Sequence, residues 1–382
     1  MVTARADQNE SGQGDGDAPS IVALVLAGGT GSRLYPASRS TRPKQFLPLL
    51  GETTLLERTI DRVGFADHVV VSTRPSFADG VRDRVGGDVE EVIVEPAGKD
   101  TGPALAYATH RIEQRYGDSV VLALPSDHHV GSDEAFAVTM RRGARVAHDE
   151  DRLVAFGVEP TRPDTGYGYI EPGADRGAFS ELDAFHEKPD ARTAKRYVAE
   201  GYLWNAGLFA WTPQAFREAA RDSPLAPLLT ELDEGRVKEG FAAVDPVSVD
   251  YAVMERVSDA AVVPLEVEWD DLGSWDAMQR LLPVDGDGNV ARTGVGSGRE
   301  SDSEDAGADA AATTDANGNE NENALFVDSA ENVVVSDGAH VSLVGVDGLA
   351  VVAWGDRVLV VPVEEAQRVR EVVSRLKEAG RF

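Results

Sequence analysis

The chain has 382 residues, of which 42% are hydrophobic, enough for one large domain with a sizeable core and a smaller second domain. It contains no cysteine, which excludes disulfides, thiolate metal sites and cysteine nucleophiles. Its 66 acidic residues outnumber its 37 basic residues, and the net charge of -29 disfavours nucleic acid and anionic membranes as partners.

The first 20 residues, MVTARADQNESGQGDGDAPS, are polar and rich in glycine. They lack the apolar core that a signal peptide needs, and the longest apolar runs, such as residues 21–27, are far too short to cross a bilayer. We therefore expect a cytoplasmic protein with a disordered tail over residues 1–20.

Short β-rich runs alternate with helical patterns from residue 21 onward. Strands are expected at residues 21–27, 68–73, 91–96, 119–125 and 152–158, with helices between them that include residues 53–63, 101–117 and 134–149. In the first helix, Leu55, Leu56, Ile60 and Val63 fall on one face, behind a cap that we assign to Thr53. This alternation predicts a Rossmann-like α/β fold, a parallel sheet with helices on both faces.

Three unusual segments follow these strands. They are residues 28–44 after the first strand, 95–103 after the third and 125–129 after the fourth. Ligands of open α/β sheets bind outside the carboxyl ends of the strands. We therefore expect the three segments to converge on one pocket.

The chain changes character after residue 283. Residues 296–323 contain no large apolar side chain, so we expect a disordered acidic loop there. Short strands with glycine turns occur on both sides of this loop, and an amphipathic helix follows at residues 364–379. We therefore expect a catalytic domain over residues 21–283 and a small C-terminal β domain over residues 284–382 that contains the loop.

The segment GGTGSR after the first strand does not fit the common phosphate-binding motifs. A dinucleotide fingerprint needs a third glycine where Leu34 stands, and a P-loop needs Lys-Ser/Thr where the chain has Arg33 and Leu34. A flexible glycine turn can still approach phosphate closely, with Arg33 as a fork on its oxygens and Lys44 as a mobile point charge. Taken alone, the segment fits a glycine-rich turn with surface cations better than a phosphate-binding site.

Residues 28–44, GGTGSRLYPASRSTRPK, resemble almost residue by residue the signature of the sugar-nucleotide pyrophosphorylases, with Ala37 where leucine is usual. With Gln45 and Phe46 they form PKQF, which is similar to the mannose-1-phosphate guanylyltransferase branch. Further matches follow in the family's order: EPAGKDTGPALA, LPSDHHV, DTGYGYIE, FHEKPD, YLWNAGLFAW, VDYAVMER and WDDLGSWDA. The resemblance covers residues 21–283, with a weaker echo in the C-terminal β segment.

The resemblance implies a catalytic group of Arg33, Lys44, Asp127 and Asp271, in which the two aspartates are Mg²⁺ ligands. Hard carboxylate oxygens suit Mg²⁺. Asp271 is preferred to Asp270 because it directly precedes LGSW. Without the resemblance, these aspartates would be interpreted as turn, cap or solvated surface residues.

The resemblance also implies two groups of binding residues. Nucleotide contacts are expected from Gly28, Gly29, Gly31, Glu95 and Gly98. Sugar-phosphate contacts are expected from Gly168, Glu187, Lys188 and Asn205. Aromatic residues near these positions either line the sugar pocket or pack in the core; they are Tyr167, Tyr169, Trp204, Phe209 and Trp211. The chain departs from the family pattern at Lys99, Asp100 and Gly102, close to the expected base and ribose contacts.

The implied activity is transfer of GMP from GTP to mannose 1-phosphate by a Mg²⁺-dependent homodimer, which relatives build through a left-handed β-helix-like domain. One alternative is a glucose-1-phosphate uridylyl- or thymidylyltransferase, which PKQF and YLWNAGLF disfavour. The other is a non-catalytic GDP-mannose-sensing regulatory subunit. A sensor needs no machinery for a pyrophosphate leaving group, so the presence of the four catalytic candidates disfavours it.

The basic residues are strongly biased against lysine. Lysine occurs only at Lys44, Lys99, Lys188, Lys195, Lys238 and Lys377. An acidic, lysine-poor chain predicts a salt-rich, halophilic cytoplasm, because a Debye length of roughly 3 Å at about 1 M salt screens self-repulsion. A merely soluble acidic protein would explain the net charge but not the scarcity of lysine.

Overall fold

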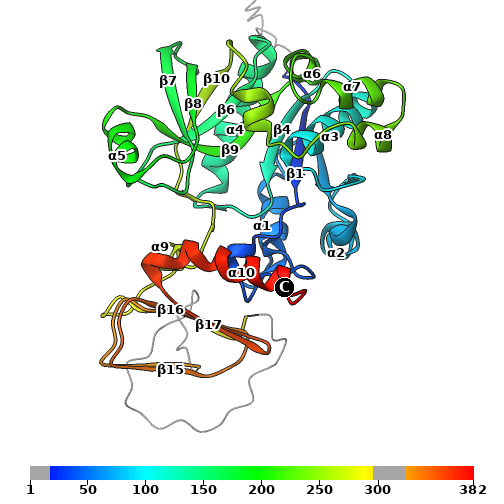
Figure 1. Ribbon diagram of the computed structural model, residues 1–382. Helices are drawn as coiled ribbons and strands as arrows, with labels where there is room; N and C mark the ends of the chain where they lie inside the picture. The colour runs from blue at the N-terminus through cyan, green and yellow to red at the C-terminus, as the bar shows by residue number, and fades with distance from the viewer. Residues whose placement is uncertain (1–17, 296–322) are drawn as a thin grey trace, which may run out of the picture.

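The computed structural model describes residues 18–295 and 323–382 (Figure 1). The predicted disordered loop at residues 296–323 and the predicted disordered tail at residues 1–20 fall almost entirely outside these described residues. Within the described residues, no helix is long and apolar enough to cross a bilayer.

A nine-stranded sheet forms the body of the molecule, in the order β3-β2-β1-β4-β9-β6-β10-β8-β7. Its β1 strand pairs in parallel with β2 and with β4, and β2 pairs in parallel with β3, as the alternating pattern predicts. The strands of the sheet are β1 (Ile21–Leu26), β2 (His68–Thr73), β3 (Glu91–Val94), β4 (Val120–Pro125), β6 (Val154–Val158), β7 (Tyr169–Asp175), β8 (Ser180–His186), β9 (Leu203–Trp211) and β10 (Ala261–Leu265).

The sheet is mixed, which corrects the prediction of a parallel sheet. The β9 strand lies between β4 and β6 and runs antiparallel to both, with Phe209 opposite Ala123 on one side and Ala155 on the other. Two antiparallel pairings, β7 with β8 and β8 with β10, extend the far edge. An apolar run such as β9 is buried on both faces in either direction, so its composition does not reveal its orientation.

Helices cover both faces of the sheet, as predicted. Alternate residues of β1 enter two separate cores: Ala23 and Val25 pack with α1, α2 and α4, whereas Val22 and Leu24 pack with α3, α6 and α7. The helices of the structure are α1 (Leu55–Arg62), α2 (Ala78–Val85), α3 (Thr101–Tyr116), α4 (Asp133–Asp149), α5 (Ala191–Ala199), α6 (Pro213–Arg221), α7 (Ala226–Asp233), α8 (Val237–Ala242), α9 (Ala277–Leu281) and α10 (Val369–Glu378).

Helix α1 begins one residue later than predicted. Its cap is Thr54 rather than Thr53: the Thr54 hydroxyl accepts from the Glu57 backbone N–H, and the Glu57 carboxylate accepts from the Thr54 backbone N–H at 2.7 Å. Only Thr54 has a glutamate three residues later, so only it can form this reciprocal pair. Leu55, Leu56 and Ile60 are buried, as predicted.

The C-terminal part winds as a β-helix-like coil below the large sheet (Figure 1). Strands β12 (Val290–Arg292), β14 (Val333–Ser336) and β16 (Leu349–Trp354) pair in parallel, and β13 (Ala324–Val327) pairs in parallel with β15 (Val341–Val344). The two sets alternate along the chain, as successive turns of a coil do. Strand β17 (Arg357–Pro362) then closes the first set in the antiparallel direction.

A third hydrophobic core joins the segment after β1 to the C-terminal part. Leu34 and Leu47 pack there with Trp275 and with residues of β14 and β16 such as Val335 and Val352. Helix α10 lies between the coil and the large sheet in Figure 1. The segment that carries the predicted phosphate contacts is therefore supported by residues about 300 positions later in the chain.

Candidate active site

The three predicted segments meet at a cavity of about 420 Å³ at the carboxyl ends of β1, β3 and β4. Gly28 and Gly29 line it from the first segment, Glu95 and Gly98 from the second, and Asp127 from the third. The segments thus converge as their positions after the strands predict.

A second cavity, of about 270 Å³, adjoins the first and shares Leu26, Thr101 and Pro125 with it. All four predicted sugar-phosphate residues line this second cavity, together with two of the catalytic candidates: Gly168, Glu187, Lys188, Asn205, Arg33 and Asp271. Apart from Gly31, the predicted nucleotide residues and the predicted sugar residues therefore separate into two neighbouring cavities.

Lys44 is buried rather than mobile, which corrects the expectation of a freely moving charge. Its side chain is 4% exposed, and its Nζ lies 2.9 Å from Asp127 Oδ2 and donates a hydrogen bond to the Asp271 backbone carbonyl. A short 3₁₀ turn, η2 (Lys44–Phe46), begins at this residue, and Gln45 and Phe46 are buried beside it. The ammonium group is therefore held between the two predicted catalytic aspartates.

Gly31 lies against Lys44 and is not among the residues that line either cavity. Its φ angle is +63°, and a Cβ atom on it would lie 2.2 Å from the Cβ of Lys44. Glycine is needed here for its backbone conformation and for the close approach of Lys44.

The surroundings of Asp127 keep its carboxylate ionised. Burial alone would raise the pKa of Asp127, but the positive charges of Lys44 and Arg33 oppose this effect, and the pKa lies below its ordinary value. Burial lowers the pKa of His128 itself, whose Nδ1 accepts a hydrogen bond from Trp269 Nε1 at 3.3 Å. Asp127 is therefore negatively charged at neutral pH, as a ligand of a metal cation needs to be.

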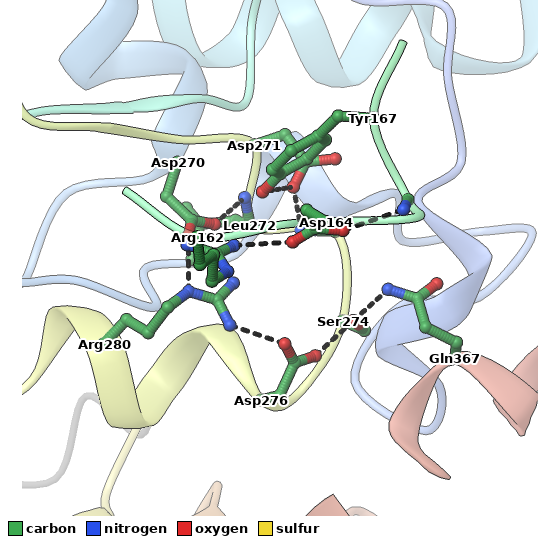
Figure 2. A network of polar contacts seen from close by, with 12 residues as sticks. Arg162, Asp164, Tyr167, Asp270, Asp271, Leu272, Ser274, Asp276, Arg280 and Gln367 are labelled. Atoms are coloured by element: carbon green, nitrogen blue, oxygen red, sulfur yellow. Dashed lines mark hydrogen bonds and ion pairs between the residues drawn. The ribbon is translucent and has the colours of Figure 1, made fainter. Parts of the chain in front are cut away.

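Asp271 faces the second cavity, whereas Asp270 is buried and fully engaged (Figure 2). Asp271 Oδ1 accepts hydrogen bonds from Tyr167 OH at 3.0 Å and from the backbone N–H of Gly273, and its Oδ2 lies 3.8 Å from Arg33. Asp270 instead forms an ion pair with Arg280 at 2.8 Å. Of the two neighbours, only Asp271 presents its carboxylate to the cavity.

Asp127 and Asp271 fit a divalent cation by their chemistry. Both are carboxylates, Lys44 contacts the side chain of Asp127 and the backbone carbonyl of Asp271, and the two side chains keep 26% and 23% exposure. Within the described ranges no group of three metal-ligating side chains occurs. Mg²⁺ does not need one, because it commonly takes one or two carboxylates and completes its shell with water and substrate phosphates.

The sugar end of the site contains a residue that motif reasoning did not single out. Asn205 Nδ2 donates to Asp250 Oδ1 at 2.7 Å, and Asn205 Oδ1 accepts from the Gly207 backbone N–H. Asp250 opens a π-helical turn, η4 (Asp250–Met254), and lines the same cavity. Asp250 belongs to the segment VDYAVMER, which resembles the family pattern, but the resemblance implied no role for any single residue of this segment.

The nucleotide end holds a buried carboxyl group. Glu95 is 5% exposed, and its Oε2 has no hydrogen-bond partner among the described residues. Burial raises the pKa of Glu95 to about 7, although the neighbouring Arg74 opposes this shift. Arg74 also lines the cavity and donates to Thr30 Oγ1 at 2.6 Å. Sequence reasoning missed Arg74, although its position directly after β2 could have indicated it.

The aromatic residues divide between the two interpretations that the sequence left open. Tyr167 and Phe209 line the second cavity. Tyr169, Trp204 and Trp211 are at most 1% exposed and belong to the hydrophobic cores.

A family model described as nucleotidyl transferase matches residues 22–284, which include both cavities. This chain belongs to the nucleotidyl transferase family. A second model, the MannoseP isomerase/GMP-like β-helix domain, matches residues 322–376 and agrees with the observed β-helix-like coil. The enzyme class and the fold expected from the sequence are both confirmed.

Relatives of this nucleotidyltransferase span nearly the whole chain. The xanthan biosynthesis protein XanB of Xanthomonas campestris pv. campestris (strain B100) is 35% identical over 94% of this chain and 74% of its own length. The mannose-1-phosphate guanylyltransferase ManC of Salmonella typhimurium is 34% identical over 94% of this chain and 73% of its own length.

A solved structure from Thermus thermophilus, described as a mannose-1-phosphate geranyltransferase, has 34% sequence identity and a TM-score of 0.80. The match covers 94% of this chain and 99% of that one. The resemblance to the mannose-1-phosphate guanylyltransferases that the sequence motifs indicated is thereby confirmed.

Proposed function

We propose that this nucleotidyltransferase transfers GMP from GTP to α-D-mannose 1-phosphate, giving GDP-mannose and pyrophosphate. One observation carries the proposal: Lys44 is fixed between Asp127, which lines the predicted nucleotide cavity, and Asp271, which lines the predicted sugar cavity. The names of relatives that cover 94% of the chain support the choice of substrates.

The chemistry requires positioning and charge more than proton transfer. A phosphate oxygen of the sugar attacks the α-phosphorus of GTP, a new P–O bond forms, and the bond to the β-phosphate oxygen breaks with release of pyrophosphate. A phosphate monoester is largely dianionic at pH 7, so the nucleophile needs no general base. Two unit charges 4 Å apart repel by about 4 kcal/mol at an effective dielectric constant of 20, so cations must offset the meeting of two anions.

Lys44 and Arg33 supply these protein cations. Lys44 is held in place before substrate arrives, which favours stabilisation of the transition state because no reorganisation is needed. Asp127 and Asp271 would hold Mg²⁺, which when bound neutralises phosphate charge and orients the phosphate groups.

The remaining predicted residues are proposed to select the substrates. In the first cavity, the unpaired Glu95 oxygen is available to accept N–H groups of guanine, and Gly98 lies beside it for the ribose. In the second cavity, Glu187 and Asn205 would bind sugar hydroxyls, Gly168 would allow close approach, and Lys188 would contact the sugar phosphate. Gly28 and Gly29 would present backbone amides to the triphosphate, while Gly31 supports Lys44.

We also propose that two copies associate through the domain at residues 284–382, beside a catalytic domain at residues 21–283. Exposed valines on the coil support this association: Val327, Val344, Val358 and Val360. The substrates proposed here are metabolites of the cytoplasm, where we expect the enzyme to act.

The association predicts that Val360→Asp, a charge placed on an exposed position of β17, yields monomers. Sedimentation of wild type and variant in the same salt measures this directly. Wild type that sediments as a monomer would contradict the proposed dimer.

A panel assay tests the function. Pyrophosphate release is measured in molar KCl with Mg²⁺, crossing GTP, ATP, UTP, CTP and dTTP with mannose 1-phosphate and glucose 1-phosphate. A signal largely confined to GTP with mannose 1-phosphate supports the proposal. UTP or dTTP with glucose 1-phosphate as the preferred pair would favour the sibling activity, and a folded chain that binds GDP-mannose without turnover would favour the regulatory subunit.

A further inference from the structure

The guanidinium group of Arg33 has a partner from the far end of the chain. Its Nη1 donates to the side-chain oxygen of Gln367 at 2.6 Å, across 334 positions of sequence, while its Nη2 lies 3.8 Å from Asp271 Oδ2. Gln367 belongs to the 3₁₀ segment η5 (Val363–Arg368), which joins the β-helix-like coil to α10. The C-terminal part of the chain therefore contacts a predicted catalytic cation.

The orientation of the Gln367 amide follows from its other contact. The Ser274 hydroxyl donates its one proton to the Asp276 carboxylate, which can only accept and is also bound by Arg280 at 2.5 Å (Figure 2). Ser274 Oγ must then accept from the Gln367 amide nitrogen, 2.8 Å away. With its nitrogen on Ser274, Gln367 necessarily presents its oxygen to Arg33.

The same network fixes the loop that carries Asp271. Arg280 Nε donates to Asp270 Oδ2 at 2.8 Å, and Asp270 Oδ1 accepts from the Leu272 backbone N–H at 2.8 Å. A continuous series of hydrogen bonds thus connects Arg33, through Gln367, to residues that precede and follow Asp271 in the sequence. Arg33 itself is the second residue of a three-residue turn, η1 (Ser32–Leu34), which has no side-chain cap of its own.

We propose that Gln367 is a positioning residue that holds the Arg33 guanidinium toward the phosphate groups of GTP, and this rests on the function proposed above. Arginine side chains have many rotamers, and a substrate-binding arginine that is already oriented loses less freedom when the phosphates arrive. An amide suits this task because its oxygen accepts from Arg33 without cancelling the positive charge.

The test compares Gln367→Ala with the same substitution at a second glutamine, Gln279. Gln367 is exposed, so we expect the variant to keep the wild-type melting temperature while kcat/KM for GTP falls about tenfold. Gln279→Ala is the control: Gln279 also reaches the C-terminal part, by donating to the Glu331 carbonyl at 2.7 Å, but among the described residues its side chain forms no hydrogen bond with Arg33. Equal losses in the two variants would overturn the proposal.

Two further variants separate positioning from packing. Gln367→Glu has nearly the same shape, but its carboxylate cannot donate to Ser274 and would neutralise Arg33, so we expect a loss at least as large as with alanine. In an Arg33→Lys background, Gln367→Ala should cause little additional loss, because the group it positions has gone. A full tenfold loss in both backgrounds would show that Gln367 acts on another group and would overturn the proposal.

Binding of GTP by titration calorimetry keeps this test independent of turnover. Gln367→Ala is expected to weaken GTP binding in the Arg33 enzyme and to leave it unchanged in the Arg33→Lys enzyme. If the wild type failed to make GDP-mannose, the proposed function would fail, while this pattern of GTP affinities would still support the Gln367 contact. Unchanged GTP affinity together with unchanged turnover in Gln367→Ala would overturn the inference alone.

Discussion

At the scale of single residues, the site is organised around a lysine that is almost completely buried. A buried ammonium group is costly unless it is paired, and Lys44 is paired with a carboxylate of Asp127 and a carbonyl of Asp271. Gly31 makes this burial possible, because any side chain at its position would collide with Lys44. The arrangement keeps a positive charge at a fixed place between the Asp127 carboxylate and the Asp271 backbone carbonyl.

This charge predicts the effect of Lys44→Met, which preserves much of the side-chain volume. We expect kcat to fall about 10²–10³-fold, as when one electrostatic contact to a transition state is removed, while the circular dichroism spectrum is retained. Lys377→Met on the exposed end of α10 is the control and should leave kcat unchanged. Near-normal turnover in Lys44→Met would refute the role of Lys44.

The pKa of Glu95 predicts a pH dependence of GTP recognition. Two guanine N–H groups require an ionised carboxylate as acceptor. With a pKa of about 7, Glu95 is about 10% ionised at pH 6 and about 90% at pH 8, so KM for GTP should fall severalfold as pH rises.

The matched variant is Glu95→Gln, measured in the same buffers. It removes the titrating group, so its KM for GTP should be higher than that of wild type at pH 8 and should vary less with pH. The same pH dependence in both proteins would show that another group, such as a phosphate of GTP, is responsible.

At the scale of elements, local signals set where helices begin, but not how strands are ordered. The reciprocal Thr54–Glu57 pair starts α1 and so sets which residues of this helix face the core. Strand β9 is apolar in sequence like β1 and β4, yet it lies between β4 and β6 and also pairs with β7, which no local pattern indicates. Asn205 lies on β9, so this placement brings it to the sugar cavity beside Asp250.

The cap predicts a difference between two adjacent threonines. Thr54→Ala should lower the free energy of unfolding by about 1 kcal/mol, because the Glu57 backbone N–H loses its acceptor. Thr53 does not make this contact, so Thr53→Ala should change the free energy of unfolding by less than about 0.5 kcal/mol. Denaturant unfolding in molar KCl measures both, and equal effects would contradict the assignment of the cap.

At the scale of the whole molecule, the C-terminal coil is part of the support of the active site. The third core contains Leu34 and Leu47 from the segment after β1, Trp275 from the loop after Asp271, and Trp354 from β16. Arg39 adds a hydrogen bond to the Trp354 carbonyl at 3.0 Å. Loss of the coil would therefore expose the apolar side chains of Leu34 and Leu47 in the segment after β1.

The net charge predicts how this assembly responds to salt. At pH 7 the formal charge of -29 produces self-repulsion that salt screens, so the melting temperature should rise steeply between about 0.1 and 1 M KCl. The rise should shrink near pH 4.5, the isoelectric point of the sequence, where repulsion vanishes. A melting temperature independent of KCl at pH 7 would contradict the halophilic interpretation.

The amino-acid sequence by itself determined the family, the alternation of strands and helices, and the convergence of the segments after β1, β3 and β4 on one cavity, because periodicity and motifs are local properties. Arg74 and Asp250 were missed because each is a single polar residue whose importance depends on what lies opposite. The direction of β9, the burial of Lys44 and the contact between Arg33 and Gln367 were decided only by the tertiary structure. Each of these features depends on contacts between residues tens to hundreds of positions apart in the sequence. Packing of the whole chain decides such contacts, and no local pattern encodes them.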